Sequence, residues 1–512
     1  MRIDIRLSDN YQGTRWYCDD KRSVFTKGYI VDPNDSSKYI DGRAFNNCIK
    51  SILSKESLSI ELPSISGNFA IIAQLSDGKC IAAVDRQRSF PLLYWTDGET
   101  IIITDSLSNI AKSRKTINNE ALLQFSRTIC VYRENTAYNE VFQIKPAHYL
   151  DVNTCGIKQI AYYTFRYCQK KNYTEENKIE LLRMCYEKIF QRLIRYLNGR
   201  QVALPLSGGR DSRLILFYLM KFGYKNIITF SYGYEGTDDQ RLSKIVADFF
   251  GANYHYVHCR RNKMRKMARR HFHKYIDFAG NGCSLPCVQE LYAVYELREK
   301  GLIQDNCVFL PGHGGDFYAG ARAVIVGGER PDEWRDSVVN HLFFKEYKYT
   351  NTALNESDRR EEANQILSKH QIVPSTLQSK EEASECIEKY YFDERESKYI
   401  QNCVRYYDYW NYEWIAPFED IILDELWLSF PLSDRVNRKL FHRFIETVYP
   451  RELLNIRFAG KPTTVLKLQW CYGFVPAVDY IKYRLFQSYA SMNQFVWSKY
   501  VKRVLALENK GD

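Results

Sequence analysis

Apolar positions divide the chain into two stretches with different periodicities. Up to about residue 168, short alternating apolar segments predict strands, at 24–31, 68–75, 80–85, 92–96, 100–105 and 148–152. The first ten residues, MRIDIRLSDN, also alternate like a strand. Helical periodicity appears at 42–55 and 119–129, while Asp77-Gly78 and Asp97-Gly98 predict hairpin turns. We therefore expect an α+β domain over residues 1–168.

The second stretch, from about residue 177, alternates strands with helices. Predicted strands lie at 202–206, 227–230, 254–257 and 307–310, with helices at 212–222 and 238–250. Thr237 and Gln240 form a capping-box pattern at the start of the second helix, and Gly251 can end it. Alternation of this kind predicts a parallel sheet. Beyond Arg330 the pattern is mostly helical, so we expect an α/β domain over 177–512, joined by a polar linker at 169–176.

Composition is that of a soluble globular protein, with 45% hydrophobic and 26% charged residues. No apolar run approaches the roughly 20 residues of a transmembrane helix, and the N-terminus lacks a signal-peptide core, so we expect a cytoplasmic protein. The 14 cysteines are scattered without a zinc-site spacing, which predicts free, buried thiols. The net charge of +11 favours acidic partners or substrates.

The most informative segment is Ser207-Gly208-Gly209-Arg210-Asp211-Ser212, between a predicted strand and a predicted helix. Glycines there let backbone N–H groups approach an anion, and the helix N-terminus favours negative charge. The serines add hydroxyl donors, and Asp211 can hold a divalent cation against phosphates. The segment resembles the S-G-G-x-D-S loop of the ATP pyrophosphatases, which split ATP between the α- and β-phosphates. It lacks the lysine of a P-loop.

A second glycine loop, Pro311-Gly312-His313-Gly314-Gly315-Asp316, follows the strand at 307–310, with Asp316 about 105 residues after Asp211. Ligands of open parallel sheets bind beyond the carboxyl ends of strands. Both glycine loops are therefore expected to converge on one crevice, where Asp316 can be the second carboxylate on a metal ion. Gly312 joins the expected nucleotide site.

With both loops placed, the chain resembles the asparagine synthetase superfamily over nearly its whole length. Further matching stretches are Gly67-Asn68-Phe69-Ala70, Asp85-Arg86 with Pro91-Leu92-Leu93-Tyr94, Glu413-Trp414-Ile415-Ala416-Pro417-Phe418-Glu419-Asp420, and Lys461 in Arg457-Phe458-Ala459-Gly460-Lys461. The resemblance implies an N-terminal Ntn-hydrolase-like glutaminase domain and a C-terminal ATP-pyrophosphatase-type domain. It also implies ATP and Mg²⁺ as cofactors.

Two departures from the family pattern change the expected chemistry. Glutaminase activity in the family uses a cysteine directly after the initiator methionine, but here Arg2 follows Met1. We therefore expect a degenerate glutaminase domain. In the second loop, His313 stands where asparagine synthetases have glutamate and the β-lactam synthetase branch has tyrosine. Histidine at this position, without the cysteine, also resembles some lasso-peptide cyclases and proteins of surface-polysaccharide clusters.

The resemblance assigns roles to individual residues. Ser207, Gly208, Gly209 and Ser212 would hold pyrophosphate, and Asp211 with Asp316 would hold Mg²⁺. Phe230, Ser231 and Tyr232 resemble the adenine-contacting segment of the family. His313 would act as the base for an incoming amine, with Glu413 as its orienting partner, and Lys461 would contact the activated intermediate.

The basic run from Arg260 to Lys274 has two interpretations, a solvated helix face or a contact with an acidic substrate or membrane surface. No recognition motif accompanies it, so nucleic acid is not expected.

The resulting hypothesis is an AMP-forming amide ligase that joins an amine donor to a small-molecule or glycan carboxylate, as in surface-polysaccharide synthesis. Three alternatives remain open at this level. They are an ammonia-using asparagine synthetase, a macrocyclase of the lasso-peptide or β-lactam synthetase type, and a non-catalytic nucleotide-binding scaffold.

Overall fold

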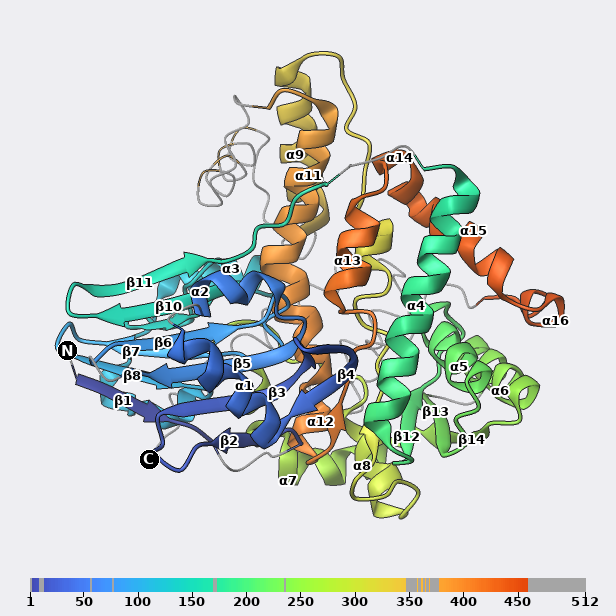
Figure 1. The fold of residues 1–512 in the computed structure, drawn as a ribbon, viewed down its shortest axis with the longest axis horizontal. Helices are drawn as coiled ribbons and strands as arrows, with labels where there is room; N and C mark the ends of the chain where they lie inside the picture. The colour runs from blue at the N-terminus through green and yellow to red at the C-terminus, as the bar shows by residue number, and fades with distance from the viewer. Residues whose placement is uncertain are drawn as a thin grey trace.

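The computed structural model describes residues 2–8, 13–55, 58–75, 78–168, 173–233, 236–346 and 377–458, together with residues 357, 361, 364 and 368. Within these, three sheets form the frame of the molecule, two from the N-terminal stretch and one from the second. Figure 1 shows the N-terminal sheets on the left, beside the long helix α4 (Glu175–Leu197), with the third sheet on the right.

The two N-terminal sheets confirm an α+β arrangement. The four-stranded sheet has the order β1 (Arg2–Arg6), β8 (Thr100–Thr104), β7 (Leu93–Thr96) and β9 (Val141–Gln143). The seven-stranded sheet has the order β11 (Gly156–Ala161), β10 (His148–Asn153), β6 (Cys80–Val84), β5 (Gly67–Gln74), β3 (Val24–Asp32) and β2 (Trp16–Cys18), with β4 (Asp35–Asp41) paired to β3. The accompanying helices are α1 (Gly42–Ser54), α2 (Leu58–Glu61) and α3 (Asn119–Thr128).

Packing of the N-terminal stretch follows from the alternation of its strands. Phe45 and Ile49 of α1 are fully buried against Ile71 and Ala83 on one face of the seven-stranded sheet. The other face shares a core with the four-stranded sheet. The predicted turn at Asp97-Gly98 is confirmed between the antiparallel β7 and β8, where Gly98 has φ of +93°. Asp77 lies outside the described residues. The Ntn-hydrolase-like assignment of this half stays a prediction.

The third sheet is parallel throughout, as the βα alternation predicted. Its order is β14 (Asn253–His258), β13 (Ile227–Gly233), β12 (Val202–Pro205), β15 (Val308–Phe309) and β16 (Glu413–Trp414). The helices between its strands are α5 (Asp211–Lys221), α6 (Asp238–Phe250), α7 (Arg261–Gly280) and α8 (Leu291–Glu299). Thr237 caps α6 by accepting a hydrogen bond from Gln240 N at 3.3 Å, and Gly251 ends it at φ of +63°.

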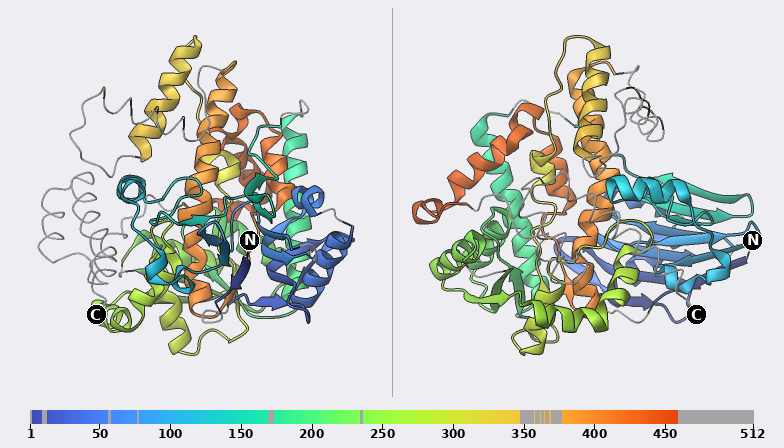
Figure 2. Two further views of the ribbon diagram at one scale, coloured as in Figure 1. Left: turned by 90° about the vertical axis from the view of Figure 1, so that its left-hand side faces the viewer. Right: turned by 180° about the vertical axis from the view of Figure 1, so that it is seen from behind.

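The chain beyond Arg330 is mostly helical in its described part. The helices are α9 (Pro331–Glu346), α11 (Lys380–Tyr390), a π-helical continuation (Tyr391–Ile400), α12 (Arg405–Tyr409), α13 (Ile421–Leu428), α14 (Leu432–Arg435), α15 (Lys439–Val448) and α16 (Arg451–Leu454). Both views of Figure 2 show the orange segment that starts with α11 running down through the molecule, and the right-hand view shows it between the two halves. The short strand β16 was not predicted, but the mostly helical character expected beyond Arg330 is confirmed for the described residues.

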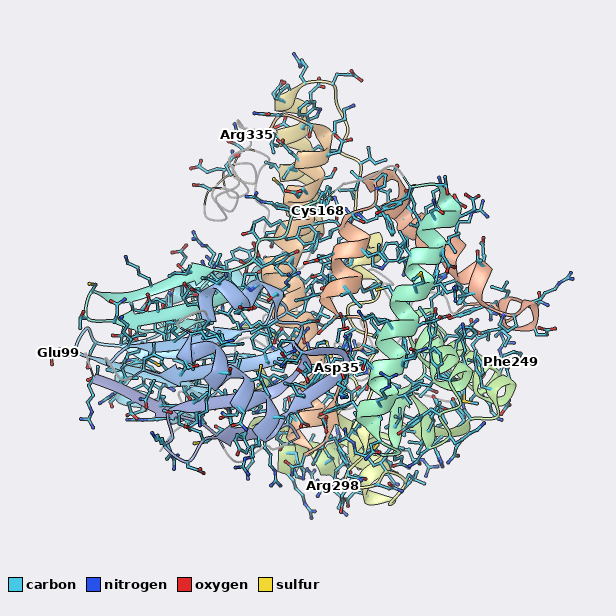
Figure 3. The ribbon with its side chains drawn as sticks, viewed as in Figure 1. Asp35, Glu99, Cys168, Phe249, Arg298 and Arg335 are labelled. Carbon is cyan, nitrogen blue, oxygen red and sulfur yellow. The ribbon has the colours of Figure 1, made fainter. Side chains whose placement is uncertain are left out.

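The two halves share a continuous interface. One core cluster joins Phe25 and Ala70 of the N-terminal sheets to Phe230 and Phe309 of the parallel sheet. In Figure 3, Glu99 lies at the outer end of the N-terminal half, on the left, and Phe249 lies at the outer end of the second half, on the right. The boundary predicted between residues 168 and 177 stays a prediction.

Two expectations from composition are met within the described chain. All of its cysteines are free, but the expectation that they are buried is wrong for Cys155 and Cys168, whose side chains are exposed. None of its helices has the length and apolar character needed to cross a membrane.

Candidate active site at the carboxyl ends of the parallel strands

The first glycine loop leaves β12 and enters α5, as the sequence predicted. Ser207 Oγ accepts a hydrogen bond from Gly209 N at 3.1 Å, and Ser212 Oγ accepts one from Ser207 N at 3.1 Å. The two hydroxyls also lie 3.1 Å apart. These contacts curl the backbone around the N-terminus of α5, where unpaired N–H groups favour an anion.

The second glycine loop packs directly against the first, which confirms their predicted convergence. A Cβ on Gly312 would stand 3.1 Å from Cβ of Asp211. One on Gly315 would stand 2.9 Å from Oδ1 of Asp211 and 2.6 Å from the Phe418 ring. A side chain at Gly312 or Gly315 would clash with its neighbours. Glycine at these two positions therefore lets the second loop approach the first this closely.

Asp211 and Asp316 form the acidic part of the site. Oδ1 of Asp211 is buried and accepts no hydrogen bond from a described group. Burial raises the pKa of Asp211 to about 7, and the nearby Asp316 carboxylate raises it further. Two acidic groups whose charges act on each other, one of them with an oxygen that has no described partner, have the chemistry expected of a divalent-cation site.

These two residues fit a Mg²⁺ ion that completes its coordination with other oxygens. In the described chain no group of three or more His, Cys, Asp or Glu side chains could hold a metal by itself. A cation between Asp211 and Asp316 would therefore take its remaining ligands from phosphate oxygens and water, as Mg²⁺ does in nucleotide sites.

His313 lies between Gly312 and Gly314 of the second loop. Its Nδ1 is buried and has no partner among the described groups. Burial lowers its pKa to about 4, opposed by the charge of Asp316. The imidazole is therefore neutral at pH 7 and presents a lone pair that can accept a proton.

The structure does not bring Glu413 to His313, so the predicted pair is not formed. Glu413 opens β16 and is paired with Val308 at the start of β15, whereas His313 follows the carboxyl end of that strand. Its carboxylate accepts hydrogen bonds from Arg200 Nη1 at 2.5 Å and Tyr196 Oη at 2.8 Å. The pair was expected from the family resemblance alone, and a linear pattern of residues does not show which distant side chains meet.

Glu396 is a carboxyl at the site that sequence reasoning missed. It belongs to the π-helical segment after α11 and lies 3.6 Å from Nε of Arg322, with only 10% of its side chain exposed. Burial raises its pKa to about 7, and Asp316 is among the charges that raise it further. No motif marks Glu396, which lies about 80 residues after the second loop.

The remaining predicted residues divide into three cases. Phe230 is fully buried, with its ring centroid 6.1 Å from that of Phe309, so its side chain belongs to the core. Ser231 and Tyr232 follow on β13 towards the crevice, and Ser231 Oγ lies 2.5 Å from Tyr254 Oη. Lys461 lies outside the described residues.

A parallel sheet with two converging glycine loops and paired carboxylates defines a nucleotide-dependent α/β enzyme. Residues 194–506, more than half of the chain, match the family model "Asparagine synthase", so the chain belongs to the asparagine synthase family. No curated protein matches the chain. The family supports an ATP-dependent carbon–nitrogen ligase function.

Proposed function

We propose that the chain is an AMP-forming amide ligase that adenylates a substrate carboxylate and transfers an amine to it. The observation that carries the proposal is the meeting of the two glycine loops at Asp211. This packing supports the proposal because the two loops carry backbone N–H groups, the carboxylates of Asp211 and Asp316, and the neutral imidazole of His313. These are the groups needed to hold a triphosphate and to accept a proton from a nucleophile.

The first half-reaction activates the acceptor. An oxygen of the substrate carboxylate attacks the α-phosphorus of ATP. The bond to the bridging oxygen of the β-phosphate breaks, and its electron pair leaves with pyrophosphate. Ser207, Gly208, Gly209 and Ser212 receive the pyrophosphate at the N-terminus of α5. Mg²⁺ held by Asp211 and Asp316 would neutralise charge on the phosphate oxygens.

The second half-reaction forms the amide. The amine attacks the carbonyl carbon of the acyl-adenylate, AMP leaves, and the amine proton passes to a base. His313 is that base, because its unpartnered ring nitrogen lies in the second loop and is neutral at pH 7. Glu396 replaces Glu413 as the carboxyl that completes this side of the site. Lys461 would offset negative charge on the adenylate.

The amine donor comes from outside the chain, since the N-terminal half lacks the family's nucleophile. Arg2 N donates a hydrogen bond to Glu99 O at 2.8 Å, so the strand start is occupied by sheet pairing. The acceptor is a small-molecule or glycan carboxylate of surface-polysaccharide or related synthesis. An acidic acceptor is supported by the exposed side chains of Lys266, Arg269 and Lys274 on α7.

Trapping with hydroxylamine tests the proposal. The full chain is incubated with ATP, Mg²⁺, hydroxylamine and a panel of uronic acids, amino acids and peptides. A cognate acid is expected to give its hydroxamate together with equal amounts of AMP and pyrophosphate. Acid-dependent formation of ADP and phosphate instead would show that the α-phosphorus is not attacked and would overturn the proposal.

A further inference from the structure

Helix α7 lies beside α8 at the lower edge of the molecule in Figure 1 and carries the basic run of the sequence. Residues 260–274 hold eight Lys or Arg and no Asp or Glu. From the second turn of α7 on, four of these side chains are exposed and are linked by steps of three or four residues. They therefore lie on one side of the helix. We define the α7 ridge as Lys266, Arg269, Arg270 and Lys274.

The charges of the α7 ridge are not neutralised by neighbouring carboxylates. No ion pair to any of its four residues occurs in the described part of the chain, whereas Lys263, one turn earlier, lies 2.9 Å from Glu296 of α8. An exposed helix that is merely solvated ordinarily mixes charges of both signs along its surface. A row of one sign without counter-charges therefore needs another explanation.

Arg298 of α8 extends this positive surface. The ring centroid of His271 on α7 lies 6.0 Å from that of Tyr295, and Arg298 follows Tyr295 by about one turn. Figure 3 labels Arg298 at the same lower edge. Burial lowers the pKa of His271, and positive charges of both helices lower it further, among them Lys274 and Arg298. Positive charge from two helices thus gathers on one face.

The charge pattern of α7 opposes the stability of the helix itself. Lys266, Arg270 and Lys274 follow one another at intervals of four residues, where like charges repel. The first turn contains no acidic residue, and Arg260 at the N-cap accepts no side-chain hydrogen bond, although a helix N-terminus favours acids. The opposite face holds α7 in place through buried apolar residues, including Met264, Met267, Phe272 and Tyr275.

The chemistry of the ridge fits a surface that attracts cations by charge alone. The Phe and Tyr side chains of α7 are buried or half-buried, so it offers no exposed ring of these types on which bases could stack. Its apolar face belongs to the core and is not available for insertion between lipids. Anionic headgroups need neither feature, since each Lys or Arg near an anionic bilayer strengthens binding about fivefold.

We propose that the α7 ridge docks the protein on an anionic phospholipid surface. The net charge of +11 gives the whole chain the complementary sign. The contact is electrostatic and reversible, with the helix lying along the surface and not within it. The inference goes beyond the proposed function and does not depend on it, because the ridge contains no residue of the two glycine loops.

Sedimentation of the full chain with vesicles tests the proposal. The vesicles contain phosphatidylcholine with or without phosphatidylglycerol, and neither ATP nor an acceptor is added. The protein is expected to sediment with the vesicles that contain phosphatidylglycerol and to stay in solution with those that do not. Binding should disappear in about 1 M salt, where the screening length falls to about 3 Å.

A double variant locates the binding surface. Lys266→Gln with Lys274→Gln should weaken partition into the anionic vesicles about 25-fold, at about fivefold for each charge. The matched control is Lys158→Gln with Lys188→Gln, which removes two exposed lysines from β11 and α4. It should change partition by no more than about twofold, because charges farther than a screening length from the surface contribute little.

Two further measurements separate lost charge from a disturbed fold. Lys266→Arg with Lys274→Arg keeps the charge and should bind the vesicles as the wild type does. The thermal midpoint of the Lys266→Gln, Lys274→Gln variant should equal or exceed that of the wild type, since repulsion between like charges on α7 is relieved.

The proposal is overturned if neutral and anionic vesicles bind the protein equally, or if the α7 variant and its control lose binding to the same extent. It is also overturned if polygalacturonate or duplex DNA retains the chain while anionic vesicles do not. Retention by polygalacturonate would instead give the ridge to the acidic acceptor. Because the assay requires no turnover, its failure would leave the ligase proposal standing, and vesicle binding would survive the failure of that proposal.

Discussion

The side-chain amide of Asn68 donates a hydrogen bond of 3.0 Å to Glu419, joining the seven-stranded sheet to the chain that supports the active site. Gln401 donates to the other carboxyl oxygen at 2.6 Å. Burial raises the pKa of Glu419 to about 8, and the charge of Asp85 raises it further. The preceding residue, Phe418, packs against the second glycine loop. The interface and the active site are thus adjacent along the chain.

Glu419 should make the stability of the protein fall as the pH rises. Its folded pKa, about 8, exceeds the value of about 4.3 expected in the unfolded chain. The folded state therefore binds more protons between these values, and its free energy of unfolding decreases across that window. Urea unfolding at pH 5 and pH 8 should show that the free energy of unfolding decreases less between these pH values in Glu419→Gln than in the wild type. Glu425→Gln, an exposed change on α13, should keep the wild-type dependence. An unchanged slope in Glu419→Gln would contradict the raised pKa.

Asp211→Asn and Asp316→Asn should each reduce carboxylate-dependent pyrophosphate release by about 10²-fold or more, because a metal ligand at the phosphates is lost. The free energy of unfolding of Asp211→Asn at pH 8 without metal should equal or exceed that of wild type. The reason is that a buried carboxyl beside another acid is replaced by a neutral amide. Asp248→Asn on the exposed face of α6 is the control. Full pyrophosphate release by Asp316→Asn would refute the metal assignment.

Gly315→Ala should disturb the active site through sterics alone. Its new methyl group would stand 2.6 Å from the Phe418 ring and 2.9 Å from Oδ1 of Asp211. Overpacking of this kind costs about 1–3 kcal/mol, and pyrophosphate release should fall with it. Gly327→Ala, which meets nothing within 4 Å, is the matched control in thermal unfolding and turnover. Equal behaviour of the two variants would mean that the loops do not pack as described.

His313→Ala should still form the adenylate but should aminolyse it about 10²- to 10⁴-fold more slowly, as loss of a general base does. Because the pKa of His313 is lowered to about 4, its neutral form persists above about pH 5, so this residue imposes no loss of rate between pH 8 and pH 6. Single-turnover aminolysis of a preformed adenylate measures both effects. If His313→Ala aminolysed the adenylate at the wild-type rate, His313 would not be the base and its role would be structural.

Glu396→Gln and Glu413→Gln should separate catalysis from stability. Glu396 lies with Asp316 at the site, so its substitution should slow aminolysis with little loss of stability. Glu413 binds Arg200 and Tyr196, so its substitution should lower the free energy of unfolding by about 1–3 kcal/mol and leave aminolysis unchanged. If Glu413→Gln slowed aminolysis and Glu396→Gln did not, Glu413 would be the partner of His313, as the sequence led us to expect.

The N-terminal half should not hydrolyse glutamine. β1 begins at Arg2 and pairs with β8, and no cysteine stands at its start among the described residues. Glutamate release from glutamine should therefore stay far below the roughly 1 s⁻¹ of ordinary enzymes. A coupled glutamate dehydrogenase assay measures the release of glutamate. Release at about 1 s⁻¹ would show that another residue acts as the nucleophile for glutamine.

The sequence by itself determined the elements whose signal is local. Strand alternation, the Thr237 cap, the Gly251 stop and the glycine loops all depend on neighbouring residues, and the structure has each where the pattern placed it. The convergence of the loops also followed, since strands of a parallel sheet end at one edge.

Tertiary structure alone decided which distant side chains meet. It paired Glu413 with Arg200 instead of His313, and it brought Glu396 within reach of the charge of Asp316. β16 has two residues and takes its conformation from β15, so its own sequence carries no strand signal. Burial and charge at such contacts arise from packing between elements, and a linear pattern does not encode them.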